Sequence, residues 1–227
     1  MHCFYVPQLV SMGPDALSDD EWRHIKALRV KSGETICLID GKGNAQHCVF
    51  HLQDKKPVLE VSTSISFHER ESGVHLYIPM TQQTDRIEWM LEKCVEMGLH
   101  SLNLMTTQHS EKVKYSIERL IRIAVSAMKQ SQRKWLPSID MIDSWDEVLH
   151  RLKGKPVFIA HCEQSEKMPW TSIQVDHPHV LIGPEGDFSR KEIGDVEDLG
   201  GVPIALGNAR LRTETAGLLV VSKYYSL

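Results

Sequence analysis

Two glycine-bearing segments near the end of the chain have the residue types and spacing of a ligand site. The first is Gly183-Pro184-Glu185-Gly186, and the second covers residues 206–216, L-G-N-A-R-L-R-T-E-T-A. Each follows a short apolar run, 179–182 and 202–206, typical of a buried parallel strand. Glycine lets a backbone approach a ligand closely, and open α/β sheets bind ligands at the carboxyl ends of their strands. Since two such loops at adjacent strand ends favour a ligand over two plain tight turns, the sequence predicts a site there.

The same loops lack the signatures of two common nucleotide sites. A phosphate-binding P-loop needs Lys and then Ser or Thr after its glycines, whereas Gly186 is followed by Asp187-Phe188. A dinucleotide site needs G-x-G-x-x-G between a strand and a helix. The G-x-G of this chain, Gly41-Lys42-Gly43, falls in a predicted hairpin. These nucleotide-binding classes are therefore disfavoured.

Alternating strands and helices position the two loops. Ser189 and Glu192 have the spacing of a helix capping box, Gly200-Gly201 ends that helix, and Thr213-Glu214 lead into an apolar helix over 216–221. Upstream, the pattern predicts strands at 74–80, 99–105 and 157–160, and helices around 87–95, 117–128 and 144–152. Regular alternation implies an α/β domain with a mostly parallel sheet covered on both faces.

The first 70 residues are predicted to be mainly β. Candidate strands lie at 3–6, 35–39, 46–52 and 58–64, with a hairpin turn at Asp40-Gly41. Ser18 and Glu21 predict the start of one helix. Short strands around one helix suggest a small barrel, and the polar run 68–73 reads as a linker. We therefore predict two domains, 1–70 and 74–227.

Composition bounds the class of protein. The chain has 227 residues, of which 41% are hydrophobic and 25% charged, and a formal charge of −4, so nucleic acid can be bound only by local patches. Five scattered cysteines without a C-x-x-C pair indicate a reduced cytoplasmic protein without structural zinc. The start of the chain does not resemble a signal peptide, and no apolar run approaches 18 residues, which predicts no membrane span.

Histidine pairs and a basic run are further candidates for binding. His47/His51 and His177/His179 have loose metal-like spacing but no third ligand near them in sequence, so we predict surface histidines and no metal site. A run of basic residues between 112 and 134 contains few acidic residues, with only Glu111 and Glu118 opposing its charge, and this excess fits phosphate binding. For Arg119 and Arg122, a solvated helix face is an equally good explanation. The run consists of Lys112, Lys114, Arg119, Arg122, Lys129, Arg133 and Lys134.

Motifs along nearly the whole chain resemble the RsmE family. These SPOUT-superfamily methyltransferases modify N3 of a uridine in small-subunit ribosomal RNA. The resemblance rests on matches in order: His24-Ile25-x-x-Leu28-Arg29 with Gly33-Glu34, the Asp40-Gly41 turn, Ile87-Glu88 through Lys93, Glu96 and Gly98, Gln130-Ser131-x-Arg133 with Pro137, the segment 183–186, Leu206-Gly207 and residues 211–216. Four positions depart from the family pattern: Asp187 for glycine, Lys129 for Glu, Met97 for Leu, and Ala209-Arg210 for Arg-Ile.

The resemblance implies a fold, a cofactor and partners. It implies a PUA-like RNA-binding barrel followed by a domain whose last segment forms a trefoil knot, and a homodimer that acts on 16S RNA within the small ribosomal subunit. The knot loops would bind S-adenosylmethionine through Ile159, His161, Ile182, Gly183, Pro184, Glu185, Gly186, Leu206, Gly207, Leu211, Arg212, Thr213 and Thr215.

The same resemblance suggests roles in catalysis and RNA binding. Arg133 and Arg212 are candidates for a cation that stabilises the uridine anion. Glu214 is a candidate base, although a carboxylate that begins a helix also serves as a partner of the helix dipole. RNA contacts are assigned to His24, Arg29, Gln130 and Arg133.

Three function classes follow from the sequence. The first is an S-adenosylmethionine-dependent RNA methyltransferase. The second is a catalytically silent RNA-binding or ribosome-assembly protein with the same fold, which would bind RNA and not the cofactor. The third, an enzyme acting on another nucleotide, is disfavoured by the missing P-loop and dinucleotide motifs. The glycines of both loops and the retained run 211–215 favour the first class.

Overall fold

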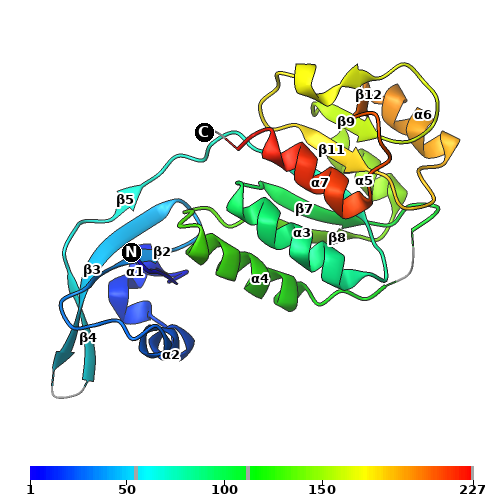
Figure 1. The fold of residues 1–227 in the computed structure, drawn as a ribbon. Helices are drawn as coiled ribbons and strands as arrows, with labels where there is room; N and C mark the ends of the chain where they lie inside the picture. Colours follow the sequence, from blue (N-terminus) through cyan, green and yellow to red (C-terminus); the bar gives the residue numbers. More distant parts are fainter. Residues whose placement is uncertain (54–55, 111–112, 226–227) are drawn as a thin grey trace. The chain divides into compact units, whose positions relative to one another are not determined.

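The computed structural model describes residues 1–53, 56–110 and 113–225, which form two compact units (Figure 1). The first unit is Met1–Arg70 with Val125–Leu136, and the second is Glu71–Ala124 with Pro137–Leu227. The inclusion of 125–136 in the first unit differs from the uninterrupted second domain that the sequence predicts. The physical reason is packing: the side chains of Met128 and Leu136 lie against the turn at Gly41 in the first unit. A Cβ atom built at Gly41 would lie 3.1 Å from Leu136 Cβ and 3.7 Å from Met128 Sδ.

The first unit is built on a five-stranded sheet. Its strands are β1 (Cys3–Tyr5), β2 (Thr35–Ile39), β3 (Asn44–Gln53), β4 (Lys56–Val61) and β5 (Ser66–Phe67). The order is β1-β2-β3-β4 with β5 on β3, and only β1 and β2 run parallel. Among the described residues of this unit, no pairing joins β1 to β4 or β5, so backbone hydrogen bonds leave the sheet open.

Local signals in the first unit are confirmed. The hairpin between β2 and β3 turns at Asp40, whose Oδ1 accepts from the amides of Lys42 and Asn44 at 2.7 and 3.0 Å. Helix α2 (Asp19–Ala27) begins where Ser18 Oγ accepts from the Glu21 amide at 3.3 Å. Two short helices, α1 (Leu9–Met12) and η1 (Gly13–Ala16), are not predicted by the sequence.

The second unit contains a seven-stranded sheet in which every pairing is parallel. The order is β10-β12-β9-β11-β6-β7-β8, and the strands are β6 (His75–Pro79), β7 (Ser101–Met105), β8 (Ser138–Ile142), β9 (Val157–Ala160), β10 (Met168–Pro169), β11 (His179–Ile182) and β12 (Val202–Ala205). The predicted parallel sheet is confirmed. The outermost strands, β8 and β10, are not predicted by the sequence.

Helices cover both faces of this sheet (Figure 1). On one face α3 (Thr84–Glu96) lies beside α7 (Thr213–Ser222); on the other, side chains of α5 (Trp145–Leu152) and α6 (Arg190–Asp198) share a core with Tyr77, Ile159 and Leu181. The helix α4 (Ile117–Gln130) and the short η2 (Trp170–Ser172) complete the elements. The capping box at Ser189 is present with both of its bonds. No helix in the described ranges combines the length and apolarity needed to cross a bilayer.

Close packing of α7 on the sheet depends on Gly217. A Cβ atom added there would lie 2.6 Å from Met90 Sδ and 3.2 Å from Leu76 Cδ2. Gly194 in α6 offers a matched comparison, because an added Cβ would have no neighbour within 4 Å.

We expect Gly217→Ala to lower the free energy of unfolding by about 1–3 kcal/mol, because it overpacks a buried contact. Gly194→Ala is expected to raise it by about 0.5–1 kcal/mol, because alanine restricts the unfolded chain and favours the helix. Urea unfolding midpoints of the two variants test the pair. Equal shifts in one direction would contradict the close-packing argument.

Candidate functional site

A cavity of about 670 Å³ lies at the carboxyl ends of β9, β11 and β12. This volume is in the range of small-molecule and cofactor sites. The two glycine-bearing loops both line it, but the prediction that their strands are adjacent is wrong. β9 lies between β11 and β12, with Ala160 in register with both Ile182 and Ile204. The loop after β9 is therefore a third wall of the site.

Most of the predicted cofactor residues line this cavity. They are His161, Ile182, Gly183, Pro184, Glu185, Leu206, Gly207, Leu211, Arg212 and Thr213. Three others lie elsewhere. Ile159 is fully buried in the core beneath α5 and α6. Ala160, the next residue of the strand, lines the cavity instead. Gly186 packs against His109, and Thr215 is exposed on α7.

Several lining residues are not among the predicted cofactor contacts. They include Cys162 and Lys167 from the loop after β9, and Asn208, Ala209 and Arg210 from the loop after β12. Arg210 Nη2 donates to the Glu185 carbonyl at 2.9 Å, and Thr213 Oγ1 donates to the Gly183 carbonyl at 2.9 Å. Both bonds tie the last loop to the segment 183–186. No motif in 162–167 signals this wall, because its residues meet the others only through the strand order.

Asp187 ties the loop after β9 to the loop after β11. Its Oδ2 accepts from the Cys162 amide at 2.7 Å and its Oδ1 from the Phe188 amide at 2.9 Å. The residue has φ +65°, the left-handed region that glycine adopts freely and Asp tolerates better than most residues. This positive φ explains why the family that the sequence resembles has glycine at this position. The Asp187 carboxylate adds two hydrogen bonds that glycine could not make.

His161 is a buried polar group in the wall of the cavity. It is 8% exposed, and neither ring nitrogen has a hydrogen-bond partner among the described residues. Burial, reinforced by the charge of Lys167, lowers the pKa of His161 below its usual value. The ring is therefore neutral at pH 7, with one donor and one acceptor nitrogen. An unpaired group of this kind is suited to a polar ligand atom.

A second, smaller cavity of about 210 Å³ adjoins the first. Pro184, Glu185 and Thr213 line both cavities, and the smaller one also contains Arg86 and Glu214. Glu214 lies in the first turn of α7, where the helix dipole favours a negative charge, and its Oε1 is 3.8 Å from Arg86 Nη1. Two adjoining cavities of unequal size suit two reacting molecules, and the boundary between them is where their reactive groups would meet.

His109 supports the wall between the two cavities. Its Nδ1 donates to the Asp187 carbonyl at 2.9 Å, and its side chain packs against Gly186.

All four predicted RNA-binding residues belong to the first unit. Arg29 and Gln130 are exposed. His24 is half-exposed and lies near Lys129 Nζ, which donates to Glu21 Oε1 at 2.6 Å. Arg133 lies in the turn after α4, where its amide donates to the Met128 carbonyl at 3.1 Å.

Within the predicted basic run, Arg119 makes two bonds to Glu88, at 2.5 and 2.8 Å, so its charge is already paired. Glu111 and Lys112 lie outside the described residues.

The loop bonds of Asp187 give an expectation for stability. Asp187→Ala places a Cβ-bearing residue at positive φ without a polar group to compensate, and we expect it to destabilise the protein by about 1–3 kcal/mol. Asp187→Gly loses the same bonds, but glycine adopts the positive φ without strain. Its free energy of unfolding should therefore fall by less than that of Asp187→Ala, even though the glycine variant removes more atoms. Guanidinium unfolding measures both variants, and an equal or larger loss for the glycine variant would contradict this reading.

Comparisons with known proteins agree with these observations. Residues 68–224 match the family model described as an RNA methyltransferase domain. A probable rRNA-methyltransferase from Porphyromonas gingivalis is 33% identical, with 96% of this chain and 94% of that chain covered and a TM-score of 0.83. The ribosomal RNA small subunit methyltransferase E from Neisseria gonorrhoeae, solved bound to S-adenosyl methionine, is 26% identical, with 98% and 96% covered and a TM-score of 0.81.

A curated relative from Bacillus subtilis (strain 168), also a ribosomal RNA small subunit methyltransferase E, is 26% identical over 91% of this chain and 88% of its own length. The chain therefore belongs to the RNA methyltransferase domain family and, within it, to the RsmE family of ribosomal RNA small subunit methyltransferases E.

Proposed function

We propose that this protein transfers a methyl group from S-adenosylmethionine to N3 of a uridine in the 16S RNA of the small ribosomal subunit. The cavity at the ends of β9, β11 and β12 carries the proposal, because it combines the volume of a cofactor site with an adjoining pocket for a second reactant. The Neisseria gonorrhoeae relative bound to S-adenosyl methionine supports the choice of methyl donor.

The residues of the larger cavity fit this cofactor. Leu206, Leu211 and Ile204 supply apolar surface for its adenine and methionine parts. Backbone polar groups of 183–185 and 206–207 are available to it, and the unpaired ring of His161 supplies another polar group. When bound, S-adenosylmethionine supplies an electrophilic methyl group on its sulfonium. The task of these residues is to hold that group in line with the accepting nitrogen, which lowers the entropic barrier.

The smaller cavity is the proposed pocket for the target base. Its volume of about 210 Å³ suits one pyrimidine ring rather than a base pair, in keeping with RNA recognition through splayed, unstacked bases. N3 of uridine carries a proton that must leave before or during attack. We assign Glu214, which lines this pocket, as the acceptor of that proton. Arg212, the N-cap residue of the same helix, lines the adjoining larger cavity and is assigned as the cation that stabilises the uracil anion.

RNA docking is assigned to the first unit. We infer that its sheet, although open in its backbone pairing, forms a PUA-like barrel together with its helices, with His24, Arg29, Gln130 and Arg133 as contacts to the RNA. The exposure of Arg29 and Gln130 supports this, as does the need for a local cationic surface in a protein of net charge −4. A ribosomal substrate also implies a cytoplasmic protein.

We further infer that the end of the chain is knotted and that two copies associate there. Segment 161–178 folds over the end of α7: Trp170 Nε1 donates to the Val220 carbonyl at 3.3 Å, Lys223 Nζ donates to the carbonyls of Trp170 and Ile173, and Tyr224 donates to Val175. This covering segment supports a threaded chain. Exposed Leu219 on α7 and Trp89 on α3 support an apolar homodimer interface.

The proposed function is tested by titrating the full-length protein with S-adenosylmethionine in a calorimeter and then mapping methyl groups on small-subunit RNA by mass spectrometry. The expected result is cofactor binding and one methylated uridine. RNA binding without cofactor binding would identify a catalytically silent RNA-binding protein instead. No response to millimolar S-adenosylmethionine would overturn the proposal.

Glu214→Gln is expected to lower kcat by about 10²–10⁴-fold, because it removes the proton acceptor while preserving shape. The Kd for S-adenosylmethionine should stay unchanged, because Glu214 lines the smaller cavity and not the larger one. Single-turnover methylation and calorimetry measure the two quantities. The exposed Glu166→Gln in the same unit is the matched control, and full activity of Glu214→Gln would reassign the acceptor.

Arg133→Ala is expected to weaken RNA binding and to reduce the slope of log K against log salt by about 1, as the loss of one phosphate contact does. Arg119→Ala is the matched control from the same basic run, because Arg119 belongs to the second unit, whereas RNA docking is assigned to the first. Filter binding across a salt series measures both slopes. Equal slopes for the two variants would remove Arg133 from the RNA contacts.

A further inference from the structure

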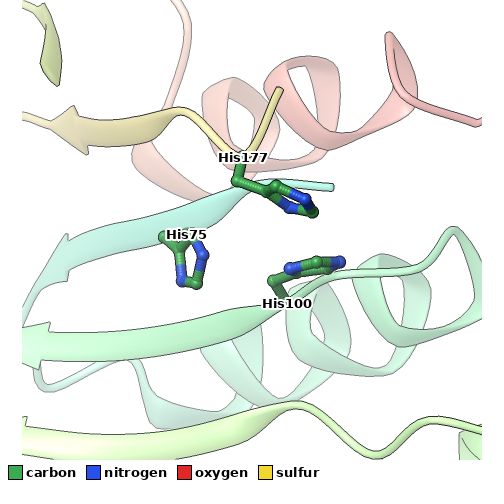
Figure 2. Close-up of side chains that lie close together, drawn as sticks. All are labelled: His75, His100 and His177. Atoms are coloured by element: carbon green, nitrogen blue, oxygen red, sulfur yellow. The ribbon is translucent and has the colours of Figure 1, made fainter. Parts of the chain in front are cut away.

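Three histidines gather at the amino-terminal edge of the parallel sheet (Figure 2). His75 begins β6, His100 directly precedes β7, and His177 lies just before β11. These strands are neighbours in the order β11-β6-β7. The edge is opposite the one that bears the cofactor cavity, so this cluster has no place in the methyl-transfer site.

The three rings have the mutual distances of a potential metal site. One ligand nitrogen from each lies within 4.8 Å of the other two. Ring centroids are 5.4 Å apart for His75 and His100, 4.7 Å for His100 and His177, and 6.5 Å for His75 and His177. His100 is buried and His177 is exposed, so the cluster opens to solvent on one side.

Hydrogen bonds orient two of the rings in the way that metal-binding histidines are oriented. His100 Nε2 lies 2.8 Å from the Glu71 carbonyl, which only accepts, so Nε2 carries the proton and Nδ1 of the neutral ring carries the lone pair. His75 Nδ1 lies 2.9 Å from Ser101 Oγ. A bond from the other ring nitrogen to a backbone carbonyl, as His100 makes, is a usual outer contact of metal-ligating histidines.

The backbone around the cluster is tightly fixed. The His75 amide donates to the Pro178 carbonyl at 2.9 Å, and the His100 amide donates to the Val74 carbonyl at 3.0 Å. A Cβ atom at Gly73 would lie 2.6 Å from His100 Cδ2, so glycine is needed for the chain to pass this ring. Two of the three ligands are therefore held in place before any ion arrives.

We propose that His75, His100 and His177 bind a divalent transition metal ion of the zinc class, with water in the fourth position. Neutral imidazole is a preferred ligand of Zn²⁺, Co²⁺, Ni²⁺ and Cu²⁺. Tetrahedral Zn–N bonds of about 2.0–2.1 Å place ligand nitrogens about 3.4 Å apart. The ligand nitrogens lie within 4.8 Å of one another, so rotation about side-chain bonds would close the cluster to that spacing, and the exposed His177 ring has room to turn.

The proposed ion would pin the amino ends of three adjacent strands together. His179 is not part of the site: its ring stacks on His75 at 4.3 Å, and its Nδ1 bonds to the Tyr77 hydroxyl at 3.1 Å. The sequence predicts no metal site, because His177 and His179 have no third ligand near them in the chain. The fold brings two further ligands to His177, His75 and His100, from distant segments.

The test uses full-length protein treated with chelator and titrated with Zn²⁺ by calorimetry and with Co²⁺ by visible absorption. His177→Asn is the diagnostic variant, because asparagine tolerates the positive φ of this position, +53°, and removes the imidazole. His150→Asn, at an exposed histidine of α5, is the matched control. We expect one bound equivalent and tetrahedral Co²⁺ bands for the wild-type protein and the control.

We expect the affinity of His177→Asn for Zn²⁺ to fall by at least about 100-fold, since weaker outer contacts already change affinity by 10–100-fold. Zn²⁺ should raise the Tm of the wild-type protein and not that of the variant. Wild-type protein that binds neither ion, or equal binding by both histidine variants, would overturn the proposal. Binding of S-adenosylmethionine by His177→Asn serves as an independent check that the methyl-transfer site is intact.

Discussion

The position of β9 between β11 and β12 is the constraint on which the site depends. Carboxyl ends of parallel strands meet at one edge, so this order inserts the loop that bears His161 between the two glycine-bearing loops. Three side-chain hydrogen bonds then set the separation of the loops. Asp187 accepts from the Cys162 amide, Arg210 donates to the Glu185 carbonyl, and Thr213 donates to the Gly183 carbonyl. Strand order decides which loops meet, and these bonds decide how far apart they stay.

Features decided by neighbouring residues could be predicted from the sequence. The turn at Asp40 and the helix starts at Ser18 and Ser189 each depend on bonds that span four residues or fewer. The strand order could not be predicted, because it depends on how α5 and α6 pack across the sheet. The family resemblance assigns Ile159 to the site, whereas its side chain lies in the core; the sequence could not correct this, because a run of four apolar residues carries no alternation that tells the core face from the cavity face.

The two ends of the parallel sheet are built on the same principle and differ in chemistry. At the carboxyl edge, loops rich in glycine and backbone polar groups enclose a cavity for an organic molecule. At the amino edge, three imidazoles from neighbouring strands converge on a point suited to an ion. In both places residues from separate segments of the chain become neighbours only through strand pairing, which is why the sequence reveals motifs within a loop more readily than clusters between loops.

The departures from the family pattern show how the site tolerates change. Asp187 takes a backbone conformation suited to glycine and adds bonds to two amides. Lys129 pairs with Glu21 at 2.6 Å, so its charge has a partner within the first unit. Arg210 reaches the Glu185 carbonyl, so the cavity retains an arginine one position beyond the usual one. Asp187, Lys129 and Arg210 thus each make a specific polar contact, whereas nothing in the structure explains Met97. The two of these three that line the cavity, Asp187 and Arg210, bond to its other loops, which is consistent with a preserved cavity rather than with its loss.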